Sequence, residues 1–242
     1  KVEAARAQFG ATRIGVLIGT STSSIGRTEA AYAQGGEERF PPEFRQPEVH
    51  NPGSPSAYVA HCAGLEGPQL TVSTACASSA RVFASAARWL QAGFVDAVLV
   101  GGVDSLCHSV LAGFQSLELT APNPCRPFDA HRDGINIGEA VGIALVTTAE
   151  RAPDSDNRLA GYSETSDPFH MTQPPPQVEA GIGVGLRPLL VRIHAERESP
   201  FLRLAIDREA DPVGPGLGLD LDVRRRLPRN GRHVGPGHVP DH

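Results

Sequence analysis

Residues 69–91 read QLTVSTACASSARVFASAARWLQ, and their pattern changes at the centre from that of a strand to that of a helix. Residues 69–74 predict a strand. Residues 77–91 carry apolar side chains at helical spacing, which predicts a helix that ends just before Gly93. Small residues on both sides of Cys76 form the turn between the two. A strand that passes directly into a helix is a building unit of layered α/β folds.

The rest of the first 173 residues continues this alternation of apolar runs and helical segments. We expect strands at 13–20, 96–102 and 140–146, and a further strand that opens at 158. Helices are expected at 2–9, 54–62 (with Ser54 as cap) and 109–117. Between them we expect a long loop at 35–58 and turns at 122–133. Because the strands are apolar throughout, they predict an α/β layered fold with covered sheets.

Cys76 has the sequence surroundings of a nucleophile. A strand runs into a small-residue turn and a helix follows at once, which exposes the side chain at a helix N-terminus. The helix dipole there favours a thiolate. The small neighbours leave room for an acyl chain and its carrier arm, and free N–H groups of the first helical turn offer a place for a thioester oxyanion. These features predict acyl transfer from a thioester to Cys76.

The other three cysteines give no comparable signal. Cys62, Cys107 and Cys125 are expected to be buried, inert side chains that pack as small hydrophobes, since nothing around them favours a thiolate. An isolated cysteine is ordinarily of this kind, and only the strand, turn and helix favour the nucleophile at Cys76. The sequence holds no CxxC pair and no His/Cys cluster with zinc-ligand spacing, so we expect no metal site.

Composition narrows the classes of function. The chain has 242 residues and a formal net charge of −5, which gives no electrostatic reason to expect a nucleic-acid partner. No apolar run approaches the roughly 20 residues that a membrane-spanning helix needs. Free thiols without a secretory signal favour a reducing compartment, so we expect a cytoplasmic protein.

Four linked motifs follow one another along the chain. They are residues 73–80 (STACASSA), 101–104 (GGVD), 125–134 (CRPFDAHRDG) and 138–142 (GEAVG), and the match extends to 161–167 (GYSETSD) and 169–172 (FHMT). In order and spacing they resemble the β-ketoacyl-acyl carrier protein synthases, condensing enzymes of the thiolase-like superfamily. The resemblance covers about residues 10–173, and four motifs together are far more specific than one.

The resemblance implies a thiolase-like fold of two similar α/β halves, usually dimeric, with Cys76 as catalytic residue. It implies that an acyl group passes from acyl carrier protein to Cys76. Decarboxylation of malonyl-carrier protein then gives a carbanion that attacks this thioester, in fatty acid or polyketide-like biosynthesis. No metal or organic cofactor is implied, because the phosphopantetheine arm arrives on the carrier protein.

Other residues of these motifs are expected to be structural. Glu139 lies between a glycine and a predicted strand, and we expect it to position the site or cap a turn. Phe114 either lines an acyl pocket or packs in the core, and an aromatic on a helix is usually core. We also predict an ion-pair network that fixes its loop, among Arg126, Asp129, Arg132 and Asp133.

The last part of the chain departs from the family pattern. The family uses two histidines of its C-terminal half to stabilise the carbanion and the oxyanion, and neither histidine motif is present. His194, His233 and His238 lack the expected surroundings, so we interpret them as surface histidines.

These observations divide the chain in two. Residues 1–173 are predicted to form a β-ketoacyl synthase N-terminal (thiolase-like) domain. Residues 174–242 hold ten Pro, nine Gly and ten Arg. We expect this atypical tail to be poorly ordered or the product of a reading-frame change. From comparison with the family pattern, we expect the chain to be incomplete at both ends.

Three hypotheses stay open. The first is an active condensing enzyme or a piece of one, as a homodimer or as a heterodimer with a synthase. The second is a truncated, non-catalytic subunit of a complete synthase, although chain-length partners usually lack the cysteine. The third is a thiolase-like acyltransferase, which shares the fold and the nucleophile, whereas the motif at 125–134 favours the synthase.

Overall fold

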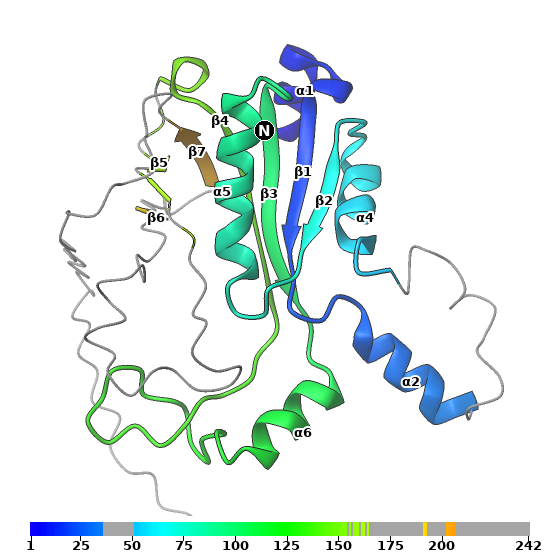
Figure 1. The fold of residues 1–242 in the computed structure, drawn as a ribbon, viewed down its shortest axis with the longest axis vertical. Helices are drawn as coiled ribbons and strands as arrows, with labels where there is room; N and C mark the ends of the chain where they lie inside the picture. Colours follow the sequence, from blue (N-terminus) through cyan, green and yellow to red (C-terminus); the bar gives the residue numbers. More distant parts are fainter. Residues whose placement is uncertain are drawn as a thin grey trace, which may run out of the picture.

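The computed structural model describes residues 1–35, 51–153, 155, 157–159, 161–162, 164, 191–192 and 202–206. These residues form a layered α/β structure around one sheet, whose strands run in the order β2-β1-β3-β4-β7-β5-β6 (Figure 1). The strands are β1 (Ile14–Gly19), β2 (Gln69–Val72), β3 (Ala97–Asp104), β4 (Ala140–Thr148), β5 (Arg158–Leu159), β6 (Val191–Arg192) and β7 (Leu202–Ile206).

The sheet is mixed, because β1 pairs in parallel with both β2 and β3 while β4 runs antiparallel to β3. The helices are α1 (Val2–Phe9), α2 (Ile25–Gly35), α4 (Ser54–Ala63), α5 (Ser78–Gln91) and α6 (His108–Ser116). The predicted α/β layered fold is therefore confirmed for these residues. None of these helices has both the length and the apolar character that a membrane span requires.

Helices cover both faces of the sheet. Residues of β1 alternate between the faces, as a strand's period of two requires: Leu17 packs with α5, whereas Val16 and Ile18 pack with α1 and α4. The core on the α5 side comprises Leu17, Val82, Ala86, Ala87, Leu90, Val95, Val98, Val100, Ala144, Val146 and Leu159. This two-sided burial fixes the register of the strands and thereby the height at which each strand ends.

Helices α2 and α6 lie beyond the carboxyl ends of β1 and β3 (Figure 1). No element was predicted for residues 25–35, and α2 buries only Ala31, so it lacks the apolar stripe that marks a core helix. The Glu29 carboxylate accepts the N–H groups of His108 and Ser109, each at 2.8 Å. Hydrogen bonds from Ser109 and His108 hold the pKa of Glu29 below its ordinary value. The acidic side chain thus caps the N-terminus of α6.

Two details differ from the sequence-based expectation. Gly53 is the N-cap of α4 and Ser54 is its first helical residue. Ala140–Gly142 are exposed although a buried strand was predicted from Ala140. They pair with Gly102–Asp104, at and beyond the first turn of α5, where that helix no longer covers the sheet.

Two short strands come from the segment after residue 173. β7 pairs in parallel with β4 and with β5, and β6 pairs antiparallel with β5. The rest of 174–242 lies outside the described residues. The division of the chain at residue 173 therefore stays a prediction.

Asp96 ties the amino ends of β1 and β3 together. Its carboxylate accepts from the Arg13 guanidinium at 2.7 Å and from Arg151 at 2.6 Å, and its carbonyl accepts from the Thr147 hydroxyl at 2.9 Å. The hydrogen bond from Arg13, supported by the one from Arg151, outweighs burial and holds the pKa of Asp96 below its ordinary value. The ionised carboxylate therefore stabilises the fold.

Asp96→Asn is expected to lower the free energy of unfolding near pH 7 by about 1 kcal/mol. Since folding lowers the pKa of Asp96 from the unfolded value near 3.9, this contribution is complete above about pH 5 and is lost as the pH falls through the folded-state pKa. Urea unfolding of both proteins at several pH values measures the gap. The gap should close in acid, and a gap that stays constant on acidification would contradict the assignment.

Candidate active site

The strand topology brings the ends of three strands to one edge of the sheet. β1, β2 and β3 are parallel, and Gly19 lies opposite both Val72 and Gly102. Their carboxyl ends therefore stand side by side at the same height (Figure 1). The residues that follow β2 lead directly to Cys76. Ligand sites of open α/β sheets commonly lie at this edge, beyond the carboxyl ends of the strands.

The turn that carries Cys76 is closed by hydrogen bonds of its own residues. The N–H groups of Ala77 and Ser78 donate to the carbonyls of Thr74 and Ala75, at 3.2 and 3.0 Å. The Ser78 hydroxyl accepts from the Thr74 N–H at 2.8 Å and donates to the Ala75 carbonyl at 2.6 Å. Ala75 adopts a positive φ of 49°, a conformation that is rare for alanine. Such a tight turn exposes the residue at its tip.

Helix α5 begins later than predicted. Its first residue is Ser78 and Ala77 is its N-cap, so Cys76 precedes the helix by two residues instead of standing directly at its start. The reason is the Ser78 side chain, which bonds back onto the turn and closes it before the helix begins. Because the N–H groups of Ala77 and Ser78 already have carbonyl partners in the turn, they are not available to an oxyanion.

Two glycines let the first turn of α5 lie directly on the sheet. A Cβ at Gly19 would come within 2.5 Å of the Ser78 backbone. A Cβ at Gly102 would come within 2.2 Å of the Ser79 hydroxyl oxygen and 2.8 Å of its Cβ. Both distances are shorter than any unstrained contact, so only glycine fits at either position. The glycines of β1 and β3 thus set the depth at which the Cys76 turn stands.

Asp104, the last residue of β3, holds the polar residues that follow β1. Its carboxylate accepts from the Thr20 hydroxyl at 3.2 Å, from the Ser21 N–H at 2.7 Å and from the Ser21 hydroxyl at 3.3 Å. The Ser21 carbonyl in turn accepts from the Ser73 hydroxyl at 3.2 Å. Ser73 is the first residue after β2. Hydrogen bonds thus connect the ends of all three strands.

The four cysteines differ in exposure. Cys76 is exposed, as expected for a nucleophile, and Cys107 is buried, as predicted. The prediction of a buried side chain was wrong for Cys62, which is exposed, and Cys125 is only half-buried. Cys62 lies on the outer face of α4, one turn after the exposed Tyr58, and it raises the pKa of that tyrosine through a side-chain hydrogen bond. An isolated cysteine on a helix carries no sequence signal for which face it occupies.

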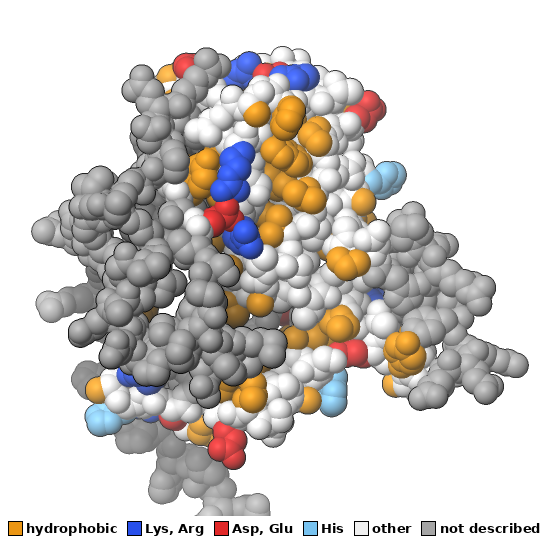
Figure 2. Space-filling model, viewed as in Figure 1, with side chains coloured by type: hydrophobic (Ala, Val, Ile, Leu, Met, Phe, Trp, Pro, Cys, Tyr) orange, Lys and Arg blue, Asp and Glu red, His pale blue; other side chains and the backbone are white. Residues whose placement is uncertain are grey.

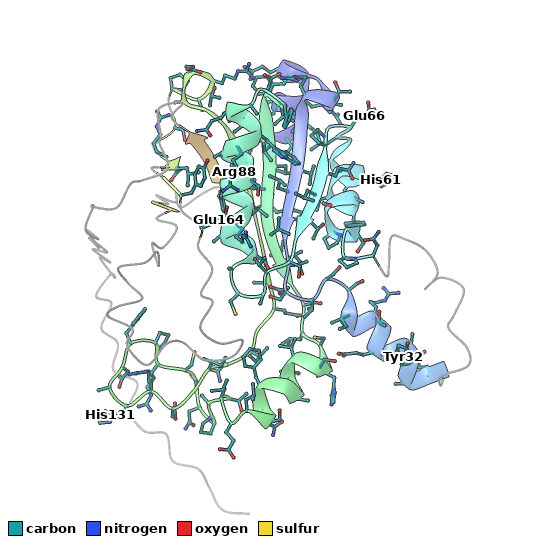
Figure 3. All side chains as sticks on the ribbon, viewed as in Figure 1. Tyr32, His61, Glu66, Arg88, His131 and Glu164 are labelled. Carbon is teal, nitrogen blue, oxygen red and sulfur yellow. The ribbon has the colours of Figure 1, made fainter. Side chains whose placement is uncertain are left out.

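The outer face of α5 is joined to Tyr162 and Glu164. Arg81 and Arg88 both hydrogen-bond the Glu164 carboxylate, and the Arg88 guanidinium stacks over the Tyr162 ring at 5.1 Å (Figure 3). Burial opposes ionisation of Glu164, but the two arginine hydrogen bonds outweigh it and hold the pKa of Glu164 below its ordinary value. Basic and acidic side chains accordingly stand together on this face (Figure 2). The contact secures α5, and with it the turn before the helix.

A family model described as the β-ketoacyl synthase N-terminal domain matches residues 3–152, which include the Cys76 turn and the three strand ends around it. The chain belongs to the β-ketoacyl synthase family. The resemblance of its motifs to that family is therefore confirmed.

Similar proteins support the assignment. The 3-oxoacyl-[acyl-carrier-protein] synthase 2 of Staphylococcus aureus is 32% identical to this chain over 184 residues, covering 71% of this chain and 45% of that protein. The chain thus spans less than half the length of this curated relative.

Solved structures of ketosynthases are also similar. One is the ketosynthase ApeO in complex with its chain length factor ApeC from Xenorhabdus doucetiae, with 38% identity and a TM-score of 0.59, covering 72% of this chain and 43% of that one. Another is a type II polyketide synthase acyl-carrier protein in complex with its ketosynthase. The match has 25% identity and a TM-score of 0.58, and it covers 70% of this chain and 46% of that one.

The loop of the third β-ketoacyl synthase motif is held by one ion pair and by backbone contacts. Arg126 lies 3.6 Å from the Asp133 carboxylate. Asp129 accepts the His131 N–H at 2.7 Å, and the Arg132 guanidinium donates to the Asp129 carbonyl, not to its carboxylate. The predicted network of four charged residues is thus reduced to one ion pair among them.

Two polar residues, Asn136 and Ser78, close turns of this chain, and neither contact was predicted from the sequence. Asn136 accepts the Cys125 N–H at 2.6 Å and donates to the Asn123 carbonyl at 3.2 Å, so it closes the same loop. Ser78 closes the Cys76 turn. A serine in a run of small residues is a sequence signal for a turn that its hydroxyl closes, whereas nothing near Asn136 in the sequence marks its partners.

The remaining predicted residues have structural positions. Glu139 is exposed and accepts the Leu106 N–H at 3.1 Å, and this contact fits the expected structural role. Phe114 is half-buried on α6. His194, His233 and His238 lie outside the described residues. Among the residues that the structure describes, no three His, Cys, Asp or Glu side chains gather as metal ligands.

Proposed function

We propose that Cys76 accepts an acyl group from the phosphopantetheine thioester of an acyl carrier protein. The Cys76 sulfur attacks the thioester carbonyl carbon and forms a new carbon–sulfur bond, while the carrier thiol leaves and takes the proton that Cys76 loses. The observation that carries the proposal is the exposed thiol on a hydrogen-bonded turn at the carboxyl edge of the sheet. Family membership, and the acyl-carrier protein present in one similar structure, support an acyl carrier protein as the partner.

The second half of the proposed reaction is decarboxylative condensation. Malonyl-carrier protein loses carbon dioxide, and the resulting carbanion attacks the carbonyl carbon of the Cys76 thioester. The carbon–sulfur bond to Cys76 breaks, which gives a β-ketoacyl carrier protein and the Cys76 thiolate, and the thiolate takes a proton from solvent. Two histidines serve this step in the family, and their motifs are absent from this sequence. Condensation therefore needs histidines that this sequence does not show, and acylation of Cys76 is the half-reaction that we assign to it. A cytoplasmic location belongs to the same proposal.

Intact mass spectrometry tests the two halves separately. The chain is mixed with an acyl-carrier protein thioester, and we expect its mass to rise by that of one acyl group. Malonyl-carrier protein is then added, and we expect no elongated product from this chain alone, because the histidine motifs are absent from it. Elongation by the chain alone would contradict our account of the histidines, and the absence of any adduct would remove the catalytic proposal.

The alternative is a non-catalytic subunit that pairs with a complete synthase. This alternative is supported by a similar structure in which a ketosynthase is bound to a chain length factor. The acylation experiment separates the two functions, since a purely structural subunit binds its partner but acquires no acyl group. The exposed Cys76 favours the catalytic function.

A further inference from the structure

The Cys76 turn is held from two sides, and the two sides differ in kind. On the helix side, Ser78 bonds the turn to itself, and the first turn of α5 rests on the glycines of β1 and β3. On the strand side, a backbone hydrogen bond from the Thr20 N–H to the Val72 carbonyl at 3.1 Å joins the end of β2 to the residue after β1, and the Ser73 hydroxyl then bonds the Ser21 carbonyl. Those contacts lead through Ser21 to a single carboxylate, Asp104.

We infer that Asp104 is a positioning residue for Cys76, acting through Ser21 and Ser73. The inference rests on the proposed function of Cys76. The register supports it: because Gly19 pairs with both Val72 and Gly102, residues two positions farther along each strand stand at one height. Asp104 is therefore level with Ser21 and with the first residues of the turn.

The chemistry of the contacts explains why a carboxylate is needed there. Two chain segments leave the sheet side by side beyond the backbone hydrogen bond from the Thr20 N–H to the Val72 carbonyl. One oxygen of Asp104 accepts both the Thr20 hydroxyl and the Ser21 N–H, and the other accepts the Ser21 hydroxyl. With three donors bound to Asp104, the Ser21 carbonyl is fixed as an acceptor for Ser73. Hydrogen bonds to a charged acceptor are stronger than neutral ones, so this link resists fraying at the sheet edge.

The position of a nucleophile controls its rate steeply. A displacement of about 1 Å caused by a distant substitution costs an enzyme up to about a hundredfold in rate. Ala75 is held in a conformation that alanine rarely adopts, so the turn relaxes when its supports are removed. Loss of Asp104 should therefore slow acylation of Cys76 more than it weakens thioester binding, since Asp104 bonds Thr20 and Ser21 and acts on the position of the sulfur through them.

The test compares Asp104→Ala, Ser73→Ala and the double variant with Asp96→Ala as matched control. Asp96 precedes β3 and Asp104 ends it, and both carboxylates tie β3 to residues beside β1. We expect the maximal acylation rate to fall about tenfold in Asp104→Ala, with the half-saturating thioester concentration unchanged within about twofold. The double variant should be no slower than Asp104→Ala, because the two residues act in one chain of contacts. Asp96→Ala should lose stability but keep its rate.

Conservative replacement gives a second criterion. Asp104→Asn keeps one carbonyl oxygen for the Ser21 N–H and the Thr20 hydroxyl, so we expect it to recover part of the rate. Rate losses that multiply in the double variant, or an equal loss in Asp96→Ala, would overturn the inference.

Hydrogen exchange makes the result independent of the proposed function. The N–H groups of Ala77 and Ser78 report on the turn, and we expect both to exchange faster in Asp104→Ala and in Ser73→Ala but not in Asp96→Ala. If the wild type takes up no acyl group, the proposed function fails, whereas exchange still decides whether Asp104 holds the turn. Unchanged exchange in both variants refutes the inference in either case.

Discussion

Alanine in place of Cys76 is expected to abolish the acyl adduct that the wild-type chain forms with an acyl-carrier protein thioester. The sulfur is the only atom of the proposed site that becomes covalently bound, so no partial activity remains when it is removed. Intact mass measured over time gives the adduct fraction. Removal of the nucleophile from a covalent enzyme lowers rates by roughly a millionfold, which here means no detectable adduct.

Cys62→Ala is the matched control, because Cys62 is also an exposed free cysteine. It should acquire the acyl group at the wild-type rate. Alkylation with iodoacetamide, followed by peptide mapping, shows independently that Cys76 remains accessible in this variant. An adduct that persists in Cys76→Ala and disappears in Cys62→Ala would reverse the assignment of the nucleophile.

The second large effect is expected for Gly19→Ala. The new Cβ would lie 2.5 Å from the backbone carbon and oxygen of Ser78, and backbone atoms cannot rotate away as a flexible side chain does. The first turn of α5 must therefore lift from the sheet. Overpacking of this kind costs about 1–3 kcal/mol, and we expect about 2 kcal/mol in the free energy of unfolding. The Cys76 turn lifts together with Ser78, so acylation should slow as well.

Gly142→Ala provides the comparison, since it changes a glycine of β4 whose added Cβ meets nothing within 4 Å. Its stability should stay equal or rise by about 0.5 kcal/mol, because alanine loses less backbone entropy on folding. Urea unfolding followed by the fluorescence of Trp89, the single tryptophan and a neighbour of the α5 core, measures both variants. Equal stabilities of Gly19→Ala and Gly142→Ala would show that the contact at Gly19 is not tight.

Local patterns predicted the elements that carry the site. The small residues around Cys76 indicated a turn between a strand and a helix, and Gly93 indicated the end of that helix. Gly93 indeed adopts a left-handed φ of 69° and donates its N–H to Leu90 at 3.1 Å. These predictions succeeded because turn formation and helix termination depend on residues close together in the chain.

The same local patterns could not predict contacts between residues far apart in the chain. Arg81 and Glu164 are 83 residues apart, as are Asp104 and Ser21, and no periodicity links such pairs. Helix α2 was missed for a related reason. It buries little apolar surface, and the contact of Glu29 with the first residues of α6 depends on where α6 lies.

By itself, the sequence determined that this chain has a strand, a turn and a helix around Cys76, and its motifs indicated a β-ketoacyl synthase. Tertiary structure alone decided how that turn is held. Parallel pairing at a particular register brought Gly19, Gly102 and Asp104 to the same edge of the sheet. The physical reason is that strand pairing joins residues by their height in the sheet and not by their separation along the chain.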